Sequence, residues 1–169
     1  MKKLNGAGRT WVRLSIKAAA IIVILWLCFG VFVGARRISD ISMSGRLNDG
    51  DFVLFNRISN DYSAGDVVVY ERDGREYLSE IIGVGDDLIT VNEDGFILVN
   101  NEVASEAPVF DFALGDTDPF GSGFRVPTGT YFVLNSNYEC ANDSRTFGAI
   151  YKKDIKGNII ALLLRTRSF

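Results

Sequence analysis

Residues 66–82, DVVVYERDGREYLSEII, contain two apolar runs, 66–70 and 77–82, on either side of a charged segment that includes a glycine. Short apolar runs rich in β-branched and aromatic residues and bounded by turn residues are typical of β-strands. No stretch between such runs has apolar residues repeating every 3.6 positions over three turns. The sequence predicts an all-β domain with an antiparallel, barrel-like core and no helix outside the N-terminal segment. Five further apolar runs support the all-β prediction, at residues 52–55, 88–91, 96–99, 131–134 and 159–164.

Residues 102–124 interrupt this strand pattern with an acidic segment rich in glycine, proline and phenylalanine. We expect a small inserted loop or subdomain here. Its aromatic side chains fit two interpretations. They pack the insertion onto the core, or they form an exposed apolar rim for a partner or for the bilayer surface.

An uncharged apolar run of 18 residues extends from Ala18 to Ala35. As a helix rising about 1.5 Å per residue it would measure roughly 27 Å, close to a bilayer core about 30 Å thick. The run predicts one transmembrane anchor, residues 18–35, behind a basic N-terminal segment, residues 1–17. Its last three residues also fit a signal-peptide cleavage site, but a secretory apolar region is shorter, about 7 to 15 residues. We therefore expect an uncleaved anchor.

Charge is divided unevenly along the chain. Residues 1–37 hold seven Lys and Arg and no Asp or Glu, whereas residues 38–169 hold 11 basic and 21 acidic residues, a net charge of −10. The positive-inside rule predicts a cell-membrane protein with residues 1–17 in the cytoplasm and residues 38–169 as an extracytoplasmic domain. An acidic domain repels phosphate backbones, so we expect no nucleic-acid partner.

The residue types that bind metals are scarce. The chain has no histidine and two cysteines, Cys28 in the apolar run and Cys140, and its carboxylates show no recognisable metal-ligand spacing. We expect no metal site, no cofactor and no intramolecular disulfide. Without histidine a Ser-His-Asp triad is impossible, so a nucleophilic serine would need another base, such as lysine.

Four sequence blocks follow the apolar run: SMSGRLNDGD at 42–51, GDVVVY at 65–70, IIG at 81–83 and DSRTFG at 143–148. In this order and spacing they resemble bacterial type I signal peptidases, and the compact chain resembles the Gram-positive branch of that family. The resemblance covers nearly the whole chain. It implies an antiparallel β core behind a membrane anchor, and, for the family, a serine endopeptidase that removes signal peptides from exported precursors.

The resemblance assigns the nucleophile position to Ser42, whose backbone amide would help to stabilise the oxyanion. The general base of the family is a buried lysine, kept neutral by desolvation. Ser79 occupies the position of that lysine here, and its neighbour Glu80 would point to the opposite face of a strand. The serine that orients the lysine is replaced by Ala141, and the Gly-Asp-Asn turn of the family reads Asn-Ser-Asn at 135–137. The resemblance therefore predicts a site without its base.

Two further departures flank the nucleophile. The usual glycine two residues before it is Asp40, whose charge would oppose an oxyanion, and the usual Pro-Thr after it is Gly-Arg at 45–46. The supporting framework is intact. Asp143 and Arg145 are expected to form a charge pair that, with Ser144, holds a loop near the site.

The only lysines after the anchor are Lys152, Lys153 and Lys156. The resemblance aligns them with surface positions or strand ends. We expect a solvated basic patch there and not a replacement base.

In the resembled family the substrate lies as an added β-strand between the segment before the serine and the strand with the lysine, here residues 38–41 and 77–82. The residues expected to bind such a peptide are Asp40, Ile41, Met43, Tyr77, Ile81 and Ala141.

Two functions follow from the resemblance. The first is a catalytically inactive signal-peptidase-like protein that binds exported precursors or pilin subunits as an accessory or chaperone in pilus assembly, with a sortase and membrane lipid as further partners. Proteins of this kind accompany sortase-built pili in Gram-positive bacteria. The second is an active signal peptidase that uses Ser42 with an unusual base. We expect the first, because the positions of the base and of its orienting serine are both changed.

Overall fold

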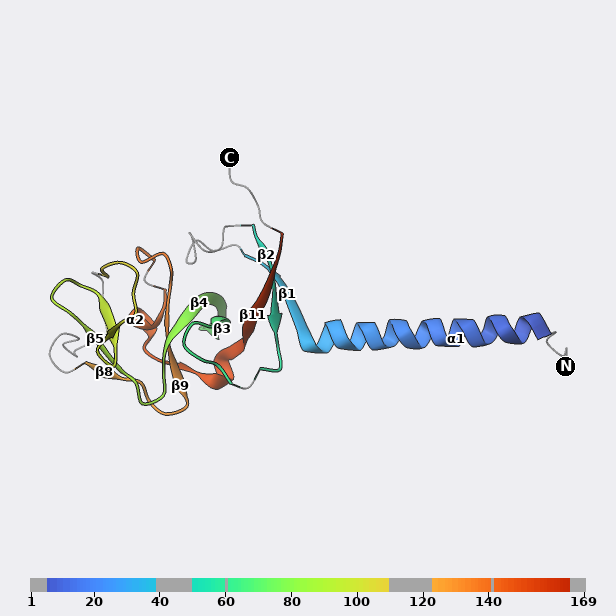
Figure 1. Ribbon diagram of the computed structural model, residues 1–169, viewed down its shortest axis with the longest axis horizontal. Helices are drawn as coiled ribbons and strands as arrows, with labels where there is room; N and C mark the ends of the chain where they lie inside the picture. The colour runs from blue at the N-terminus through green and yellow to red at the C-terminus, as the bar shows by residue number, and fades with distance from the viewer. Residues whose placement is uncertain (1–5, 39–49, 60, 110–122, 141, 165–169) are drawn as a thin grey trace. The chain divides into compact units, whose positions relative to one another are not determined.

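The computed structural model describes residues 6–38, 50–59, 61–109, 123–140 and 142–164 of the chain (Figure 1). The contacts divide the chain into a helical unit, Met1–Gly34, and a β unit, Ala35–Phe169.

The helical unit consists of α1 (Gly6–Leu27) followed by a π-helical turn, η1 (Cys28–Phe32). By length and composition, Thr10–Phe32 can cross a membrane once. This helical stretch contains most of the predicted anchor, residues 18–35. The last three residues of that range lie in a strand, β1 (Val33–Arg37).

The described strands form two sheets, labelled in Figure 1. All the strand pairs whose register is defined are antiparallel, and each of the seven runs predicted from sequence contributes a strand. The all-β, antiparallel prediction is therefore confirmed. The first sheet has the order β1, β2 (Phe52–Asn56), β11 (Ile155–Leu164), β3 (Val67–Arg72), β4 (Arg75–Val84), β9 (Thr130–Leu134) and β10 (Ile150–Tyr151). The second has the order β7 (Glu102–Val103), β6 (Ile97–Val99), β5 (Leu88–Val91) and β8 (Phe124–Arg125).

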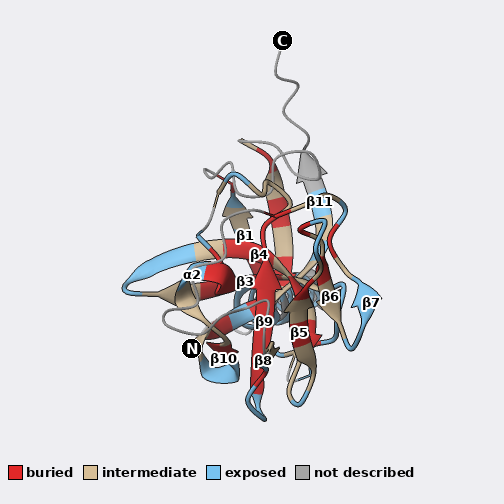
Figure 2. Ribbon diagram, turned by 90° about the vertical axis from the view of Figure 1, so that its left-hand side faces the viewer, coloured by how far each residue is buried: buried red, intermediate tan, exposed pale blue. Residues whose placement is uncertain are grey.

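Strands β3 and β4 bury both of their faces, as expected for continuous apolar runs near the middle of a sheet. Val69 and Leu78 belong to one core cluster, whereas Tyr70 and Ile81 belong to another. Strand β9 is buried along its whole length, which Figure 2 shows in red. Because neighbouring strand residues point to opposite faces, β4 presents Leu78 and Ser79 to different environments.

The prediction that helix is confined to the N-terminal segment is wrong. The β unit contains a short helix, α2 (Ser144–Phe147), and a 3-10 turn, η2 (Lys152–Asp154). Asp143 caps α2 by accepting a hydrogen bond from the backbone N–H of Arg145 at 3.0 Å. A single turn is too short to show an apolar repeat of 3.6 residues, so periodicity cannot reveal it.

The described ends of the predicted insertion, 102–124, belong to the second sheet as β7 and β8. Val109 is buried in the core cluster beside this sheet, and the ring of Phe124 packs against Phe132 with centroids 5.7 Å apart. These contacts agree with the packing interpretation for Phe124. The other aromatic residues of the insertion lie within 110–122, outside the described residues.

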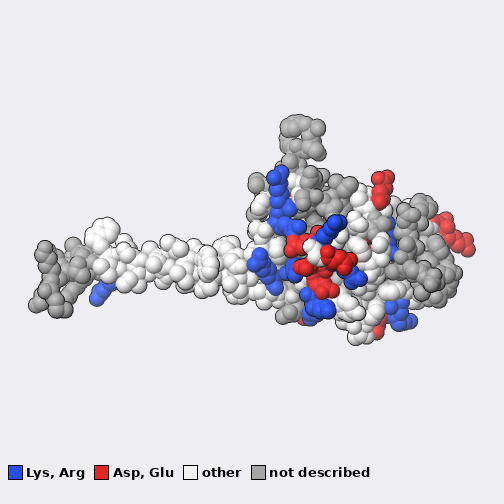
Figure 3. Space-filling model, turned by 180° about the vertical axis from the view of Figure 1, so that it is seen from behind, with Lys and Arg blue, Asp and Glu red and all other residues white. Residues whose placement is uncertain are grey.

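Ion pairs join neighbouring segments of the first sheet. Arg36 pairs with Glu76, and Lys156 Nζ lies 2.8 Å from Glu71 Oε2. Figure 3 shows basic and acidic side chains close together on one face of the β unit. Both pairs are more than a third exposed, and exposed pairs contribute only about 0–1 kcal/mol each. The sheet is therefore held mainly by its apolar clusters.

Candidate functional site

Ser79 lies fully buried on β4, on the face that also carries Tyr70. Its Oγ donates a hydrogen bond to Asn135 Oδ1 at 2.6 Å and lies 3.3 Å from the hydroxyl of Tyr70. That tyrosine hydroxyl in turn donates to the backbone carbonyl of Asn142 at 3.2 Å. The position that the resemblance assigns to the base is thus occupied by a serine whose hydroxyl is already bonded inside the protein.

Asn135 connects Ser79 to the loop after β9. Its side-chain Nδ2 donates to the carbonyl of Cys140 at 2.8 Å, and its backbone N–H donates to Asp143 Oδ2 at 2.9 Å. The residue is 1% exposed, and its bond to Asp143 is buried, whereas its bond to Cys140 is partly buried. A buried amide with its partners in place holds the loop in one conformation.

Asp143 and Arg145 form a fully buried ion pair, as the resemblance predicted. Arg145 Nη2 lies 2.8 Å from Asp143 Oδ2, and Arg145 Nε lies 2.9 Å from Oδ1. The guanidinium also donates to the carbonyls of Tyr138 at 2.7 Å and Cys140 at 2.6 Å. Ser144 Oγ accepts a hydrogen bond from the N–H of Val133 at 2.9 Å, which fastens α2 to β9. Charge-assisted hydrogen bonds of Arg145 therefore join Tyr138, Cys140 and Asp143, and a neutral bond of Ser144 adds a link to β9.

The structure brings the described site residues to one region of β4, β9 and α2. The ring of Tyr77 stacks on Tyr70, with centroids 5.7 Å apart, and contacts the ring of Phe147 at 5.3 Å. Ile81 is fully buried in the core cluster that includes Val133. The remaining predicted site residues lie outside the described residues: Asp40, Ile41, Ser42, Met43 and Ala141.

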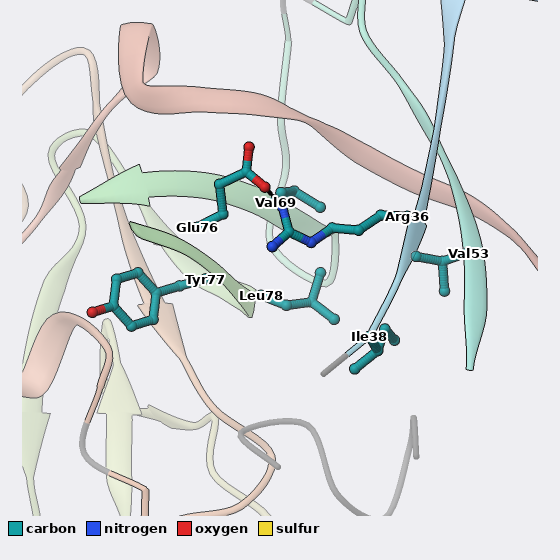
Figure 4. Close-up of a pocket in the computed structure, with 7 residues that line it drawn as sticks. All are labelled: Arg36, Ile38, Val53, Val69, Glu76, Tyr77 and Leu78. Atoms are coloured by element: carbon teal, nitrogen blue, oxygen red, sulfur yellow. Dashed lines mark ion pairs between the residues drawn. The ribbon is translucent and has the colours of Figure 1, made fainter. Parts of the chain in front are cut away.

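An apolar hollow of about 40 Å³ lies on the other face of β4, between this strand and the segment that leads to Ser42 (Figure 4). Arg36 and Glu76 form their ion pair at its side, while the ring of Tyr77 points away from the aliphatic residues. Of the two segments expected to flank a bound peptide, the hollow thus contacts Ile38 of the first and Tyr77 and Leu78 of the second. Its lining residues are Arg36, Ile38, Val53, Val69, Glu76, Tyr77 and Leu78.

Comparison with known proteins identifies the family of this chain. Residues 9–164 match the family described as signal peptidase, peptidase S26. The chain belongs to this family. The resemblance read from the four sequence blocks is therefore confirmed. Together with the apolar helix, membership of the signal peptidase family indicates a membrane-anchored protein, and it implies binding of exported precursors that carry signal peptides.

Two relatives and one solved structure show how similar the chain is to named signal peptidases. The inactive signal peptidase IA of Staphylococcus aureus is 33% identical over 147 residues, 83% of each chain. Signal peptidase I S of Bacillus subtilis is 29% identical over 172 residues, covering 93% of this chain and 91% of the relative. A signal peptidase I crystal structure from Enterococcus faecalis aligns with a TM-score of 0.45 at 21% identity, over 59% of this chain and 97% of that one.

Sequence reasoning placed Ser79 at the base position of a signal peptidase but missed the side chain that bonds to it. By the resemblance, Asn135 stands where the turn of the family has glycine, so its amide is an addition beside the position that the resemblance assigns to the base. The two positions are 56 residues apart and meet through the pairing of β4 with β9. The departure at residue 135 was visible in the sequence, but its contact with Ser79 was not.

The described site has little capacity for proton abstraction. An alcohol such as Ser79 is a far weaker base than a neutral amine, and its hydroxyl is committed to Asn135. Glu80 lies on the opposite face of β4, where it lines a different hollow with Glu106 and Tyr138. The lysines after the anchor, Lys152, Lys153 and Lys156, are exposed, whereas the reaction needs a buried one.

Proposed function

We propose that this chain is a signal peptidase-like protein without peptidase activity, which binds an extended segment of an exported protein. The observation that carries the proposal is the hydrogen bond between buried Ser79 and Asn135 at the position of the base. A lysine there would need the space and the bonding partners that Asn135 now uses. Support also comes from the name of the relative in S. aureus, an inactive signal peptidase.

The apolar hollow supports retained peptide binding. Its walls come from Ile38 and from strands β1 to β4, so a peptide strand added between Ile38 and β4 would place an alternate side chain against Leu78 and Val69. Main-chain hydrogen bonds supply affinity in this mode, and a small hollow selects side chains by size. Neither contribution requires a base.

We further propose an accessory or chaperone role in pilus assembly, in which exported precursors or pilin subunits are the bound peptides and a sortase is a functional partner. The resemblance to Gram-positive signal-peptidase-like proteins of pilus systems supports this role. The uneven charge supports residues 1–17 in the cytoplasm and the β unit outside the cell.

A cleavage assay tests the loss of activity. Purified full-length protein and its Ser42→Ala variant, incubated with a signal-peptide precursor in detergent micelles, are expected to give the same background rate. In an active serine peptidase, loss of the nucleophile lowers kcat by roughly 10⁶-fold. If the unaltered protein cleaves the precursor and Ser42→Ala does not, the protein is instead a working signal peptidase with an unusual base. The retained Ser42 is the observation that favours this second function.

Leu78→Trp tests the hollow as a peptide-binding feature. The indole should fill a space of about 40 Å³ and weaken binding of a fluorescent precursor peptide by roughly tenfold, measured by anisotropy. Val103→Trp on exposed β7 is the matched control and should bind as the original protein does. Equal affinities for both variants would place the peptide elsewhere.

Genetic complementation tests the pilus role. In a host strain whose pili depend on this gene, Ser42→Ala should restore polymerised pilin on immunoblots as well as the unaltered gene does. Leu78→Trp should restore much less. Loss of pili with Ser42→Ala, at unchanged protein level, would show that the hydroxyl is needed and would contradict the proposal.

A further inference from the structure

A second hollow, larger than the apolar one, is surrounded by three cationic side chains. Ser79 is not among the residues that line it. The hollow measures about 450 Å³, within the range of about 300–1,000 Å³ usual for ligand pockets. The described residues that line it include no carboxylate, although residues 38–169 carry a net charge of −10. The lining residues are Arg57, Ser59, Tyr62, Lys152, Lys153 and Ile155.

Nearby contacts of the β unit hold these cations around the hollow. The Arg57 guanidinium lies 5.6 Å from the ring centroid of Phe55, and Lys153 Nζ lies 5.3 Å from that of Tyr151. Lys152 Nζ is 3.9 Å from the exposed carboxylate of Asp61, a distance at which the attraction is weak in water. The ammonium groups therefore remain able to bind a further anion.

The strand directions place this hollow at the end of the first sheet that is tethered to the membrane helix. The start of β2 lies beside the end of β1, because the backbone of Ile38 bonds to Gly50 and Asp51 at 2.8 Å each. Strand β2 therefore runs back toward Ala35, which begins the β unit. Antiparallel pairing of Asn56 with Asn158 brings the start of β11 to the same end. Arg57 and the residues just before β11 thus lie at that end of the sheet.

The chemistry of the hollow fits a phosphate group. Guanidinium and ammonium groups are the usual protein partners of phosphate oxygens, and Arg supplies two parallel donors. A hydroxyl from Ser59 and one from Tyr62 lie on the same lining and suit a polar headgroup. Burial and the neighbouring Tyr131 and Asp66 raise the pKa of Tyr62, so its phenol stays neutral at physiological pH.

We propose that this hollow binds the phosphate headgroup of an anionic phospholipid in the leaflet from which the anchor emerges. The membrane lipid is favoured over a free phosphate because the chain passes directly from the apolar helix into β1, and a covalent link to the bilayer raises the local concentration of headgroups. Basic clusters next to a membrane helix are attracted to anionic leaflets in the same way. Binding would hold the β unit against the bilayer, whether or not a peptide is bound at the apolar hollow beside Leu78.

Hydrogen exchange of the full chain in nanodiscs tests the proposal. Backbone amides of residues 57–59 and 152–156 should exchange about tenfold more slowly in discs containing phosphatidylglycerol than in discs of phosphatidylcholine alone. The triple variant Arg57→Gln, Lys152→Gln and Lys153→Gln should lose this difference. A charge-matched control, Arg72→Gln, Arg75→Gln and Arg125→Gln, lies outside the hollow and should keep it. Unchanged exchange at residues 131–134 of buried β9 verifies folding.

Three results would overturn the proposal. Equal exchange of the unaltered protein in both discs would show that the headgroup is not bound. The same loss in the control and in the hollow variant would assign the effect to overall surface charge. Equal protection by inorganic phosphate or glycerol phosphate in phosphatidylcholine discs would make the hollow a site for soluble anions, whereas protection by the lipid alone supports the assignment.

Discussion

Arg145→Met should lower the free energy of unfolding by about 3–5 kcal/mol, the usual cost of removing one partner from a buried ion pair. The change leaves the Asp143 carboxylate charged and without its guanidinium in a fully buried position. It also removes the donors to the carbonyls of Tyr138 and Cys140. Thermal unfolding of the full chain in detergent, followed by the β-sheet circular dichroism signal, measures the loss.

Two companion variants separate charge from geometry. Arg145→Lys keeps the positive charge but cannot reproduce the planar fork that binds one carboxylate and two carbonyls, so it should recover only part of the stability. Combining Arg145→Met with Asp143→Asn removes both charges and should also be less harmful than Arg145→Met alone. A loss below about 1 kcal/mol for Arg145→Met would show that the loop does not depend on this pair.

Ser79→Lys should also destabilise the protein by several kcal/mol, because it introduces a cation at a fully buried position whose neighbours are already bonded to one another. The new side chain must displace Asn135 from its contact with residue 79 and, through it, disturb the bond to Cys140. Thermal unfolding under the same conditions as above measures this loss.

Matched variants show whether the cost comes from the lysine or from the loss of the serine hydroxyl. Ser79→Ala leaves Asn135 Oδ1 without its donor and should cost about 1–3 kcal/mol, less than Ser79→Lys. Adding Asn135→Gly to Ser79→Lys should restore part of the stability, because the amide no longer competes for the space. If Ser79→Lys is as stable as the original protein, the base position is open and the explanation offered for inactivity is wrong.

The Asn135 substitution also bears on any attempt to restore catalysis. Replacing Ser79 by lysine and Ala141 by serine returns the two groups that the family uses, but Asn135 still occupies the space beside residue 79. Asp40, two residues before the nucleophile position in the sequence, would add a negative charge that opposes an oxyanion. The proposed inactivity therefore rests on several linked positions and not on one missing side chain.

Much of the fold was predictable because it depends on local pattern. Runs such as 66–70 and 77–82 become β3 and β4 since β-branched and aromatic residues fit a buried, pleated sheet. The charge pair of Asp143 with Arg145 was expected from the family motif and is present. The short helix α2 was missed, because one capped turn leaves no periodic signal.

The sequence by itself determined the strands, the apolar helical segment and the family, and through the resemblance it predicts that the base is missing at position 79. Only the tertiary structure decided which side chain bonds to Ser79, and where the cations after the apolar segment gather. The Ser79–Asn135 bond and the basic hollow between Arg57 and Lys153 each join residues far apart in the chain. Such contacts depend on which strands pair and in which register, and these are properties of the whole sheet that no single stretch of sequence encodes.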